Sequence, residues 1–135
     1  MDLEVLIIDD DEVVVFIQKK MMAHHDISKN PKTFKRAEAA LAFLDTEDNG
    51  DTHYLILLDI NMPEMTGWEF LKILDKKVDK ERFHIIMVTS SVEKKDKEIA
   101  KKFSTVKEFL EKPITSQSCK AIKEIPEISH FFQTV

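Results

Sequence analysis

The feature that most constrains this chain is a short apolar run that ends abruptly at a carboxylate. Four aliphatic residues occupy positions 55–58, and Asp59 follows them directly. A run of this kind is typical of a strand buried on both faces, as the central strands of parallel sheets are. Asn61, Pro63 and Gly67 then predict a loop. Asp59 is therefore expected at the carboxyl edge of a sheet, where open α/β sheets bind their ligands.

Segments of strand and helix character alternate along the whole chain. The expected strands are 3–8, 32–36, 55–58, 85–88 and 106–110, and the expected helices are 12–25, 37–44, 67 to about 78, about 93–103 and about 116–124. Five strands alternating with five helices predict βα units, which form a parallel sheet with helices on both faces. The fold class is therefore α/β with a doubly wound parallel sheet.

Local patterns add detail to three of the helices. In helix 12–25, the spacing of Val13, Ile17 and Met21 predicts the buried face, and Asp10 or Asp11 is expected to cap its start. Helix 93–103 has a sparse apolar face and is expected to be lightly anchored. Pro126 should end or kink the last helix. The apolar residues after it are expected to pack back on the domain, with a dimer contact as the alternative.

Length and composition limit the class of protein. At 135 residues the chain is expected to form one domain (1–135), with a core over about 3–125 and an apolar tail over 126–135. A net charge of −5 argues against nucleic-acid binding and against a basic membrane-binding patch. Cys119 is the single cysteine, so an internal disulfide is excluded. No run reaches membrane-spanning length and no signal peptide is recognised, which favours a cytoplasmic protein.

Polar side chains follow four of the five predicted strands. They are Asp9 and Asp10, then Asp59, Thr89 and Lys112. Because the strands are parallel, these ends lie at the same edge of the sheet and are expected to be neighbours. Clustered carboxylates repel one another unless a cation joins them, and oxygen ligands suit Mg²⁺ or Mn²⁺. The chemistry that fits is attack of the Asp59 carboxylate on a metal-bridged phosphoryl group, with Lys112 and Thr89 stabilising the phosphoryl oxygens.

The sequence lacks the residues that are typical of several other enzyme classes. The two glycines of the chain exclude a phosphate-binding P-loop and a dinucleotide fingerprint. There is no Ser/His/Asp order, and His84 starts a strand at the opposite edge from Asp59. The remaining histidines, His53 among them, are expected at the surface.

Because these residues occur in the order and at the spacing of one known family, the chain resembles the response-regulator receiver domain. The matching motifs are Asp9-Asp10, the Leu-Leu-Asp-Ile-Asn-Met-Pro-Glu-Met-Thr-Gly sequence around Asp59, Thr89-Ser90 and Glu111-Lys112-Pro113. The resemblance covers about residues 3–125. It implies the flavodoxin-like (CheY-like) fold, with strand order 2-1-3-4-5. It also implies that the Lys112–Pro113 peptide bond is cis, as the low cost of cis X–Pro bonds permits.

The resemblance further implies a function and its residues. Asp59 is the expected phosphoacceptor, which takes a phosphoryl group from a histidine kinase or a histidine phosphotransfer protein. Asp10, Asp59 and the Asn61 carbonyl are expected to bind Mg²⁺ or Mn²⁺, with Asp9 acting mainly through water. Thr89, Lys112 and Phe109 form the expected switch. The expected output is a conformational change of the face formed by helix 93–103, strand 106–110 and helix 116–124, which signals to a downstream protein, or transfer of the phosphoryl group onward. The protein is expected to be a monomer or weak dimer.

The chain departs from the family pattern in three places, and two other functions stay open. The switch aromatic is Phe109 where the family often has tyrosine, Ser104-Thr105 replaces a small-residue turn, and Pro126 interrupts the final helix. A metal-dependent phosphatase also uses an aspartyl nucleophile but typically has a second aspartate two residues later, where this chain has Asn61. That difference argues against a turnover enzyme. A purely structural binding module would not need four polar strand ends at one site.

Overall fold

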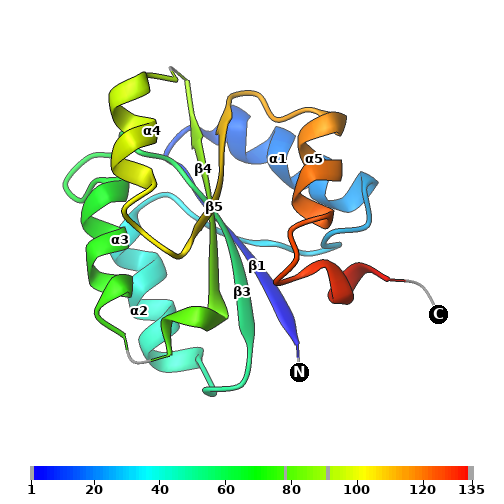
Figure 1. The fold of residues 1–135 in the computed structure, drawn as a ribbon, viewed down its shortest axis with the longest axis horizontal. Coiled ribbons are helices and arrows are strands. Elements are labelled where there is room, and N and C mark those ends of the chain that lie inside the picture. Colours follow the sequence, from blue (N-terminus) through cyan, green and yellow to red (C-terminus); the bar gives the residue numbers. More distant parts are fainter. Residues whose placement is uncertain (1, 78, 91, 134–135) are drawn as a thin grey trace.

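A five-stranded parallel sheet runs through the centre of the protein (Figure 1), in a computed structural model that describes residues 2–77, 79–90 and 92–133. The strands are β1 (Leu3–Ile8), β2 (Lys32–Phe34), β3 (His53–Leu58), β4 (Phe83–Thr89) and β5 (Val106–Glu111). Their order is β2-β1-β3-β4-β5, and all pairs are parallel. The predicted fold and strand order are confirmed, and β3 is the central strand.

Helices cover both faces of this sheet. They are α1 (Glu12–His24), α2 (Ala37–Glu47), α3 (Gly67–Asp75), α4 (Lys94–Ala100) and α5 (Ser116–Lys123), with the short 3-10 helices η1 (Lys80–Arg82) and η2 (Ser129–Phe132). α1 and α5 lie on one face, and α2, α3 and α4 lie on the other (Figure 1). The third helix ends before the predicted limit, and Val78 lies outside the described residues. Among the described helices, none combines the length and apolar character that a membrane span requires.

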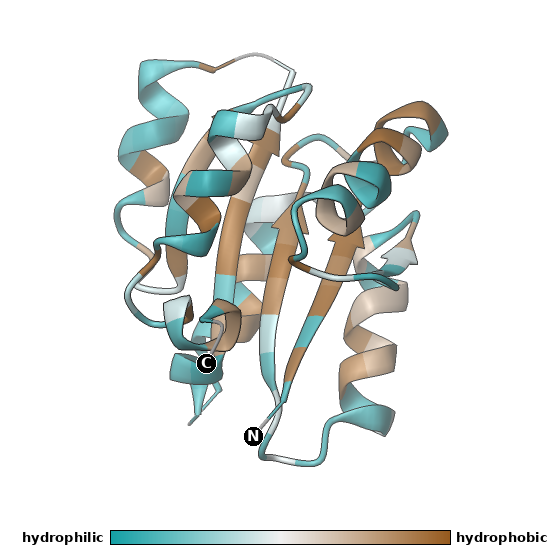
Figure 2. Ribbon diagram, turned by 90° about the vertical axis from the view of Figure 1, so that its right-hand side faces the viewer, coloured by the Kyte–Doolittle hydropathy of each residue, from teal (hydrophilic) through white to brown (hydrophobic). Residues whose placement is uncertain are grey.

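Successive residues of β3 contribute to two separate apolar layers. Leu55 and Leu57 pack in the layer with α1 and α5, whereas Ile56 and Leu58 pack in the layer with α2 and α3. All four side chains are at most 1% exposed. The strands accordingly form an apolar band inside a more hydrophilic surface (Figure 2). The uninterrupted apolar run at positions 55–58 is explained by this burial on both faces.

The buried face of α1 differs from the predicted one. Val13 and Ile17 are 68% and 37% exposed, and Met21 is only half-buried. Gln18 and Met22 are the buried residues of the helix. The first residues of α1 include five consecutive apolar side chains, which surround the helix on all sides. Apolar spacing therefore could not select one face, and packing against β1 and α5 selects it instead.

The C-terminal tail packs back on the sheet as predicted, over residues 126–133; positions 134–135 of the predicted tail lie outside the described residues. Ile125 and Ile128 are buried in the layer beneath α1 and α5, and Phe131 and Phe132 pack partly buried against it. The prediction of a lightly anchored fourth helix is also confirmed, since Ala100 is the one buried residue of α4.

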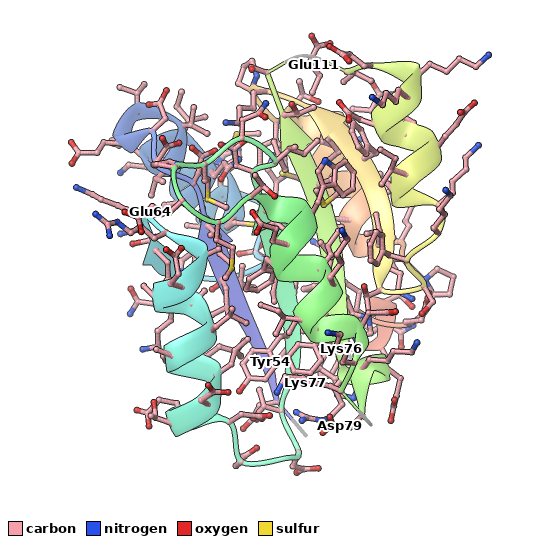
Figure 3. All side chains as sticks on the ribbon, turned by 90° about the vertical axis from the view of Figure 1, so that its left-hand side faces the viewer. Tyr54, Glu64, Lys76, Lys77, Asp79 and Glu111 are labelled. Atoms are coloured by element: carbon pink, nitrogen blue, oxygen red, sulfur yellow. The ribbon has the colours of Figure 1, made fainter. Side chains whose placement is uncertain are left out.

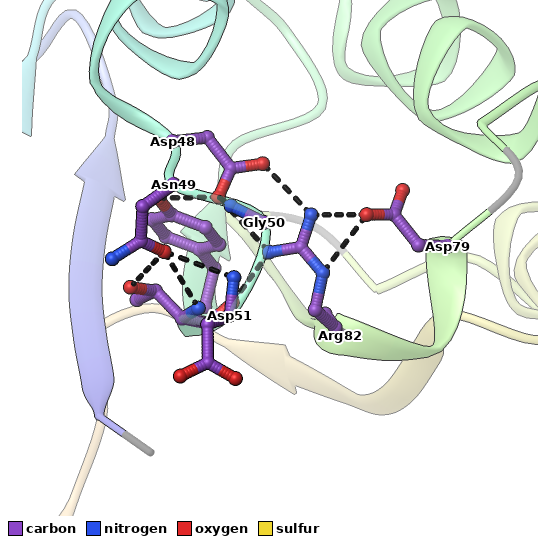
Figure 4. A network of polar contacts seen from close by, with 8 residues as sticks. Asp48, Asn49, Gly50, Asp51, Asp79 and Arg82 are labelled. Carbon is purple, nitrogen blue, oxygen red and sulfur yellow. Dashed lines mark hydrogen bonds and ion pairs between the residues drawn. The ribbon is translucent and has the colours of Figure 1, made fainter.

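A buried arginine joins two loops at the amino end of the sheet (Figure 4). Arg82 is 8% exposed, and its two Nη atoms donate to the two carboxylate oxygens of Asp48 at 2.9 and 2.8 Å. It also donates to the Thr52 carbonyl at 2.6 Å and pairs with Asp79. Hydrogen bonds from Arg82 lower the pKa of Asp48 to about 2. This network fastens the α2–β3 turn to the segment before β4; Asp79 and Tyr54 lie at the same end in Figure 3.

Replacing Arg82 should destabilise the fold markedly. Arg82→Leu leaves the Asp48 carboxylate without its cation, and breaking such a buried pair costs about 3 kcal/mol or more. Urea unfolding measures the loss. Lys80→Ala is the matched control, because Lys80 makes a half-exposed ion pair with Asp75 at 3.3 Å and exposed pairs are worth less than about 1 kcal/mol. Equal effects of the two substitutions would contradict this role for Arg82.

Candidate functional site

Three aspartates meet at the carboxyl edge of the sheet. Asp9 follows β1 and Asp59 follows β3, and they are 2% and 5% exposed, whereas Asp10 is exposed. One carboxylate oxygen of each lies within 4.8 Å of the others. The Asp59 backbone N–H donates to the Ile8 carbonyl at 3.0 Å, so the hydrogen bonding of the sheet continues to this residue. The sheet itself therefore holds Asp9 and Asp59 in place.

Lys112 places a cation between the two buried carboxylates. Its Nζ lies 2.7 Å from Asp9 Oδ2 and 3.3 Å from Asp59 Oδ1. Its backbone N–H donates to the Thr89 carbonyl at 2.7 Å, which fixes the chain beyond β5 against the end of β4. The Lys112–Pro113 peptide bond is cis, as predicted.

The site carries more negative charge than Lys112 neutralises. Burial and the neighbouring Asp9 carboxylate raise the pKa of Asp59 to about 6, although Lys112 and the Asn61 backbone N–H oppose the rise. Burial also acts to lower the pKa of Lys112, but its ion pairs with Asp9 and Asp59 dominate and raise that pKa. Lys112 therefore stays an ammonium group, while Asp59 holds a proton unusually well for a carboxylate.

The donor set fits a hard divalent cation. Asp9, Asp10 and Asp59 offer only oxygen ligands, the type that Mg²⁺ and Mn²⁺ prefer. The exposed Asp10 leaves one side open to water, which Mg²⁺ usually retains. A cation here would also remove the repulsion that raises the Asp59 pKa.

The loop that follows Asp59 is held by Gly67, whose role the sequence analysis did not recognise. A Cβ atom on Gly67 would lie 2.6 Å from the Asp59 carbonyl oxygen, so only glycine fits. The Gly67 N–H donates to the Ile60 carbonyl at 2.9 Å. The preceding Thr66 caps α3 in a capping box with Glu69. That Thr-x-x-Glu signature is readable in the sequence and could have placed the start of the helix against the site.

The remaining residues predicted for the site are Thr89, Asn61 and Phe109, and each lies in a different segment of the chain. Thr89 is 1% exposed at the end of β4, and Asn61 is exposed in the loop two residues after Asp59. Phe109 is half-buried in β5, opposite Met87 of β4, and packs in the layer with α2 and α3. Phe109 thus contributes to the core beside the site.

Asp11 has a structural role, as expected for a charge at a helix start. Its carboxylate accepts hydrogen bonds from the Val13 and Val14 N–H groups at 2.9 and 3.3 Å and caps α1. Its own N–H donates to Asp9 Oδ1 at 2.9 Å. The cap therefore also orients the Asp9 carboxylate toward Lys112.

Replacing Asp59 with asparagine should stabilise the protein when divalent cations are absent. Folding raises the pKa of Asp59 from 3.8 to about 6, so the folded chain binds this proton more tightly than the unfolded chain does. The contribution of Asp59 to stability is therefore fully present below about pH 4 and is lost as the pH rises through 6. We expect Asp59→Asn to raise the free energy of unfolding by about 1–3 kcal/mol at pH 7 and by much less at pH 4.

Urea unfolding in a chelator at both pH values provides the measurement. The exposed Asp51 gives the control, because Asp51→Asn should change stability by less than about 0.5 kcal/mol. A loss of stability in Asp59→Asn at pH 7 would contradict the proposed repulsion.

Comparison with known proteins identifies the family and agrees with the fold. Residues 5–123 match the family model described as the response regulator receiver domain. The crystal structure of a two-component response regulator from Legionella pneumophila is 30% identical, with 90% of this chain and 95% of that chain covered, at a TM-score of 0.70. A two component response regulator from Cytophaga hutchinsonii is 23% identical, with 90% and 93% covered and a TM-score of 0.80.

A response regulator receiver protein from Dyadobacter fermentans is 24% identical, with 98% of this chain and 99% of that chain covered, at a TM-score of 0.78. No curated protein sequence gives a significant match. The family match extends over most of the chain and includes every residue of the acidic cluster. The chain belongs to the response regulator receiver domain family.

Proposed function

We propose that this protein is a phosphoacceptor switch in which Asp59 takes a phosphoryl group from a phosphohistidine. The donor is a histidine kinase or a histidine phosphotransfer protein. The observation that carries the proposal is the position of Asp59, a buried carboxylate that lies 3.3 Å from the Lys112 ammonium group and within 4.8 Å of two further carboxylates. A carboxylate that only stabilised a turn would need neither neighbour.

The chain supplies a nucleophile and groups that stabilise the transferred oxygens. An Asp59 oxygen forms a bond to phosphorus while the P–N bond to the donor imidazole breaks, and the imidazole nitrogen keeps the electron pair of that bond. Lys112 and the Thr89 hydroxyl would stabilise the phosphoryl oxygens. Asp10, Asp59 and the Asn61 carbonyl would hold Mg²⁺ or Mn²⁺, with Asp9 acting through water, and the bound ion would neutralise charge on the phosphoryl group. Asn61 offers no general acid, so the product is a phosphoprotein, without enzymatic turnover.

Exposed apolar residues near the site support a protein as the phosphoryl donor. Val13 and Phe16 are 68% and 50% exposed, and Ile17 is 37% exposed. They lie in the first turns of α1, which begins three residues after Asp9. Large apolar side chains grouped on a surface commonly mark a protein contact. A donor that docks on α1 could present its phosphohistidine to Asp59.

Phosphorylation should depend on Asp59 alone. With acetyl phosphate or phosphoramidate and Mg²⁺, the intact mass of the wild-type protein should increase by one phosphoryl group. Asp59→Asn should show no increase, because the nucleophile is gone. Asp51→Asn, which changes an exposed aspartate far from the cluster, should react like the wild type. An equal gain of mass in Asp59→Asn would overturn the assignment.

Mg²⁺ binding in the unphosphorylated protein should depend on Asp10. Asp10→Ala removes one of the three carboxylates, and Mg²⁺ relies on one or two of them, so binding should be lost. The fluorescence of Trp68 should report Mg²⁺ binding, because Trp68 follows Gly67 at the start of α3. Glu12→Gln, which removes an exposed carboxylate at the start of α1, is the control and should bind normally. An unchanged Mg²⁺ titration in Asp10→Ala would argue against this ligand set.

We further propose that the signal leaves through the face formed by α4, β5 and α5. A phosphoryl oxygen on Asp59 can accept a hydrogen bond from the Thr89 hydroxyl and draw this side chain inward. Phe109, half-buried in β5, can then change rotamer toward the vacated space. α4 is anchored by one buried residue, Ala100, so a shift of this helix costs little. Phosphorylation would thereby change the populations of two conformations.

Beryllofluoride and Mg²⁺ should therefore shift amide resonances from the pocket through residues 90–112. In Thr89→Ala the pocket shifts should remain, while those on the α4–β5 surface should be largely absent. Two-dimensional NMR of both proteins provides the measurement. Shifts confined to the pocket of the wild type would favour a protein that passes the phosphoryl group onward without changing this surface.

A further inference from the structure

Two histidines, the half-buried His53 and the buried His84, form a pair at the amino end of the sheet, the end opposite Asp59. His53 begins β3 and His84 is the second residue of β4. Nδ1 of His53 lies 3.0 Å from Nε2 of His84, and the rings stack with their centroids 5.2 Å apart. The side chain of His53, expected at the surface, is half-buried against His84. His84 is 1% exposed, and its Nδ1 has no hydrogen-bond partner among the described residues.

The C-terminal segment closes over this pair. The Phe131 ring of η2 lies 5.6 Å from the His53 ring, so His53 contacts both Phe131 and His84. Ile128 of the same segment is fully buried in the layer with α1 and α5, and Glu127 pairs with Lys107 of β5 at 2.7 Å. Figure 2 shows that this segment lies at the same end of the sheet as the N-terminus.

The surroundings of the pair disfavour an added proton. His84 faces His53 and His130, Lys107 of β5 and Glu127 of the tail, and burial lowers its pKa to about 4. The charged and titratable groups around His53 are Arg82, His130, Asp51 and Glu81, and burial is again the largest cause that lowers its pKa. A neutral pair satisfies the shared hydrogen bond, with one ring donating and the other accepting. A charged His84 would be buried with its Nδ1–H unpaired.

We infer that residues 126–132 form a pH-sensitive latch, which closes on the neutral His53–His84 pair and opens on acidification. The direction of this pH effect follows from the lowered pKa of His84 in the closed form. Opening exposes the pair to water, where a histidine has an ordinary pKa of about 6.5. The closed form is therefore fully stable above that pH and loses stability as the pH falls below it. Lys107 lowers the pKa of Glu127, so this ion pair stays intact through the same range.

Hydrogen exchange of the tail amides tests the latch in the full-length protein. The N–H groups of Ile128 and Ser129 donate to the Ile125 carbonyl, and that of Phe131 donates to the Ile128 carbonyl. After correction for intrinsic exchange, their protection should fall roughly 30-fold from about pH 7.5 to about pH 5, as the shift of the His84 pKa to about 4 implies. Amides of β3 should keep their protection, which separates opening of the tail from global unfolding.

Replacing the buried His84 should remove the pH dependence of hydrogen-exchange protection in the tail. His84→Phe keeps an aromatic ring without a titrating nitrogen, so tail protection should change less than about threefold over the same range. His24→Phe alters an exposed histidine of α1 and should retain the wild-type fall. Tail protection that does not vary with pH in the wild type, or an undiminished fall in His84→Phe, would overturn the latch.

Titration of the His84 ring by NMR gives a second measurement, which does not depend on the folding of His84→Phe. Its midpoint in the wild type should lie well below 6.5. In Phe131→Ala, which weakens the cover over His53, the midpoint should move upward toward that value. A midpoint near 6.5 in the wild type, or one unaffected by Phe131→Ala, would also refute the inference.

Discussion

Repulsion between the carboxylates of Asp9 and Asp59, and its partial relief by Lys112, is the interaction that organises this protein. The two aspartates follow neighbouring strands and are almost completely buried. Burial of like charges is unfavourable unless a cation lies close to both. Lys112 meets that need from the position directly after β5, a strand two places away from β3 in the sheet. The strand order, the turn after β5 and the glycine at position 67 all serve to bring these three side chains together.

The strands and the candidate site were largely predictable because both follow from apolar runs that end at polar residues. A run such as 55–58 has one structural interpretation, and parallel strands place their carboxyl ends together. The buried face of α1 was not predictable, because apolar side chains surround its first turns. The His53–His84 pair depends on the register of β3 against β4, in which Leu55 lies opposite His84. No local pattern in the sequence encodes that register.

The two ends of the sheet solve the problem of buried charge differently. At the amino end, Arg82 donates to the Asp48 and Asp79 carboxylates and to the Thr52 carbonyl, and its hydrogen bonds lower the pKa of both aspartates. At the carboxyl end, Lys112 only partly offsets the burial of Asp59 and the repulsion from Asp9, which together raise the pKa of Asp59 to about 6. The first arrangement favours the ionised form of its carboxylates, whereas the second disfavours the ionised form of Asp59. This contrast explains why reactivity is expected at one end alone.

The short strand β2 has a consequence for the behaviour of the protein in concentrated solution. β2 forms one border of the sheet, and the unpaired backbone groups of such a border can recruit a strand from another molecule. Here the border is three residues long, with Lys32 and Thr33 exposed. An incoming strand would gain few hydrogen bonds and would have to desolvate a lysine. Border strands of this kind protect a parallel sheet against intermolecular β-aggregation.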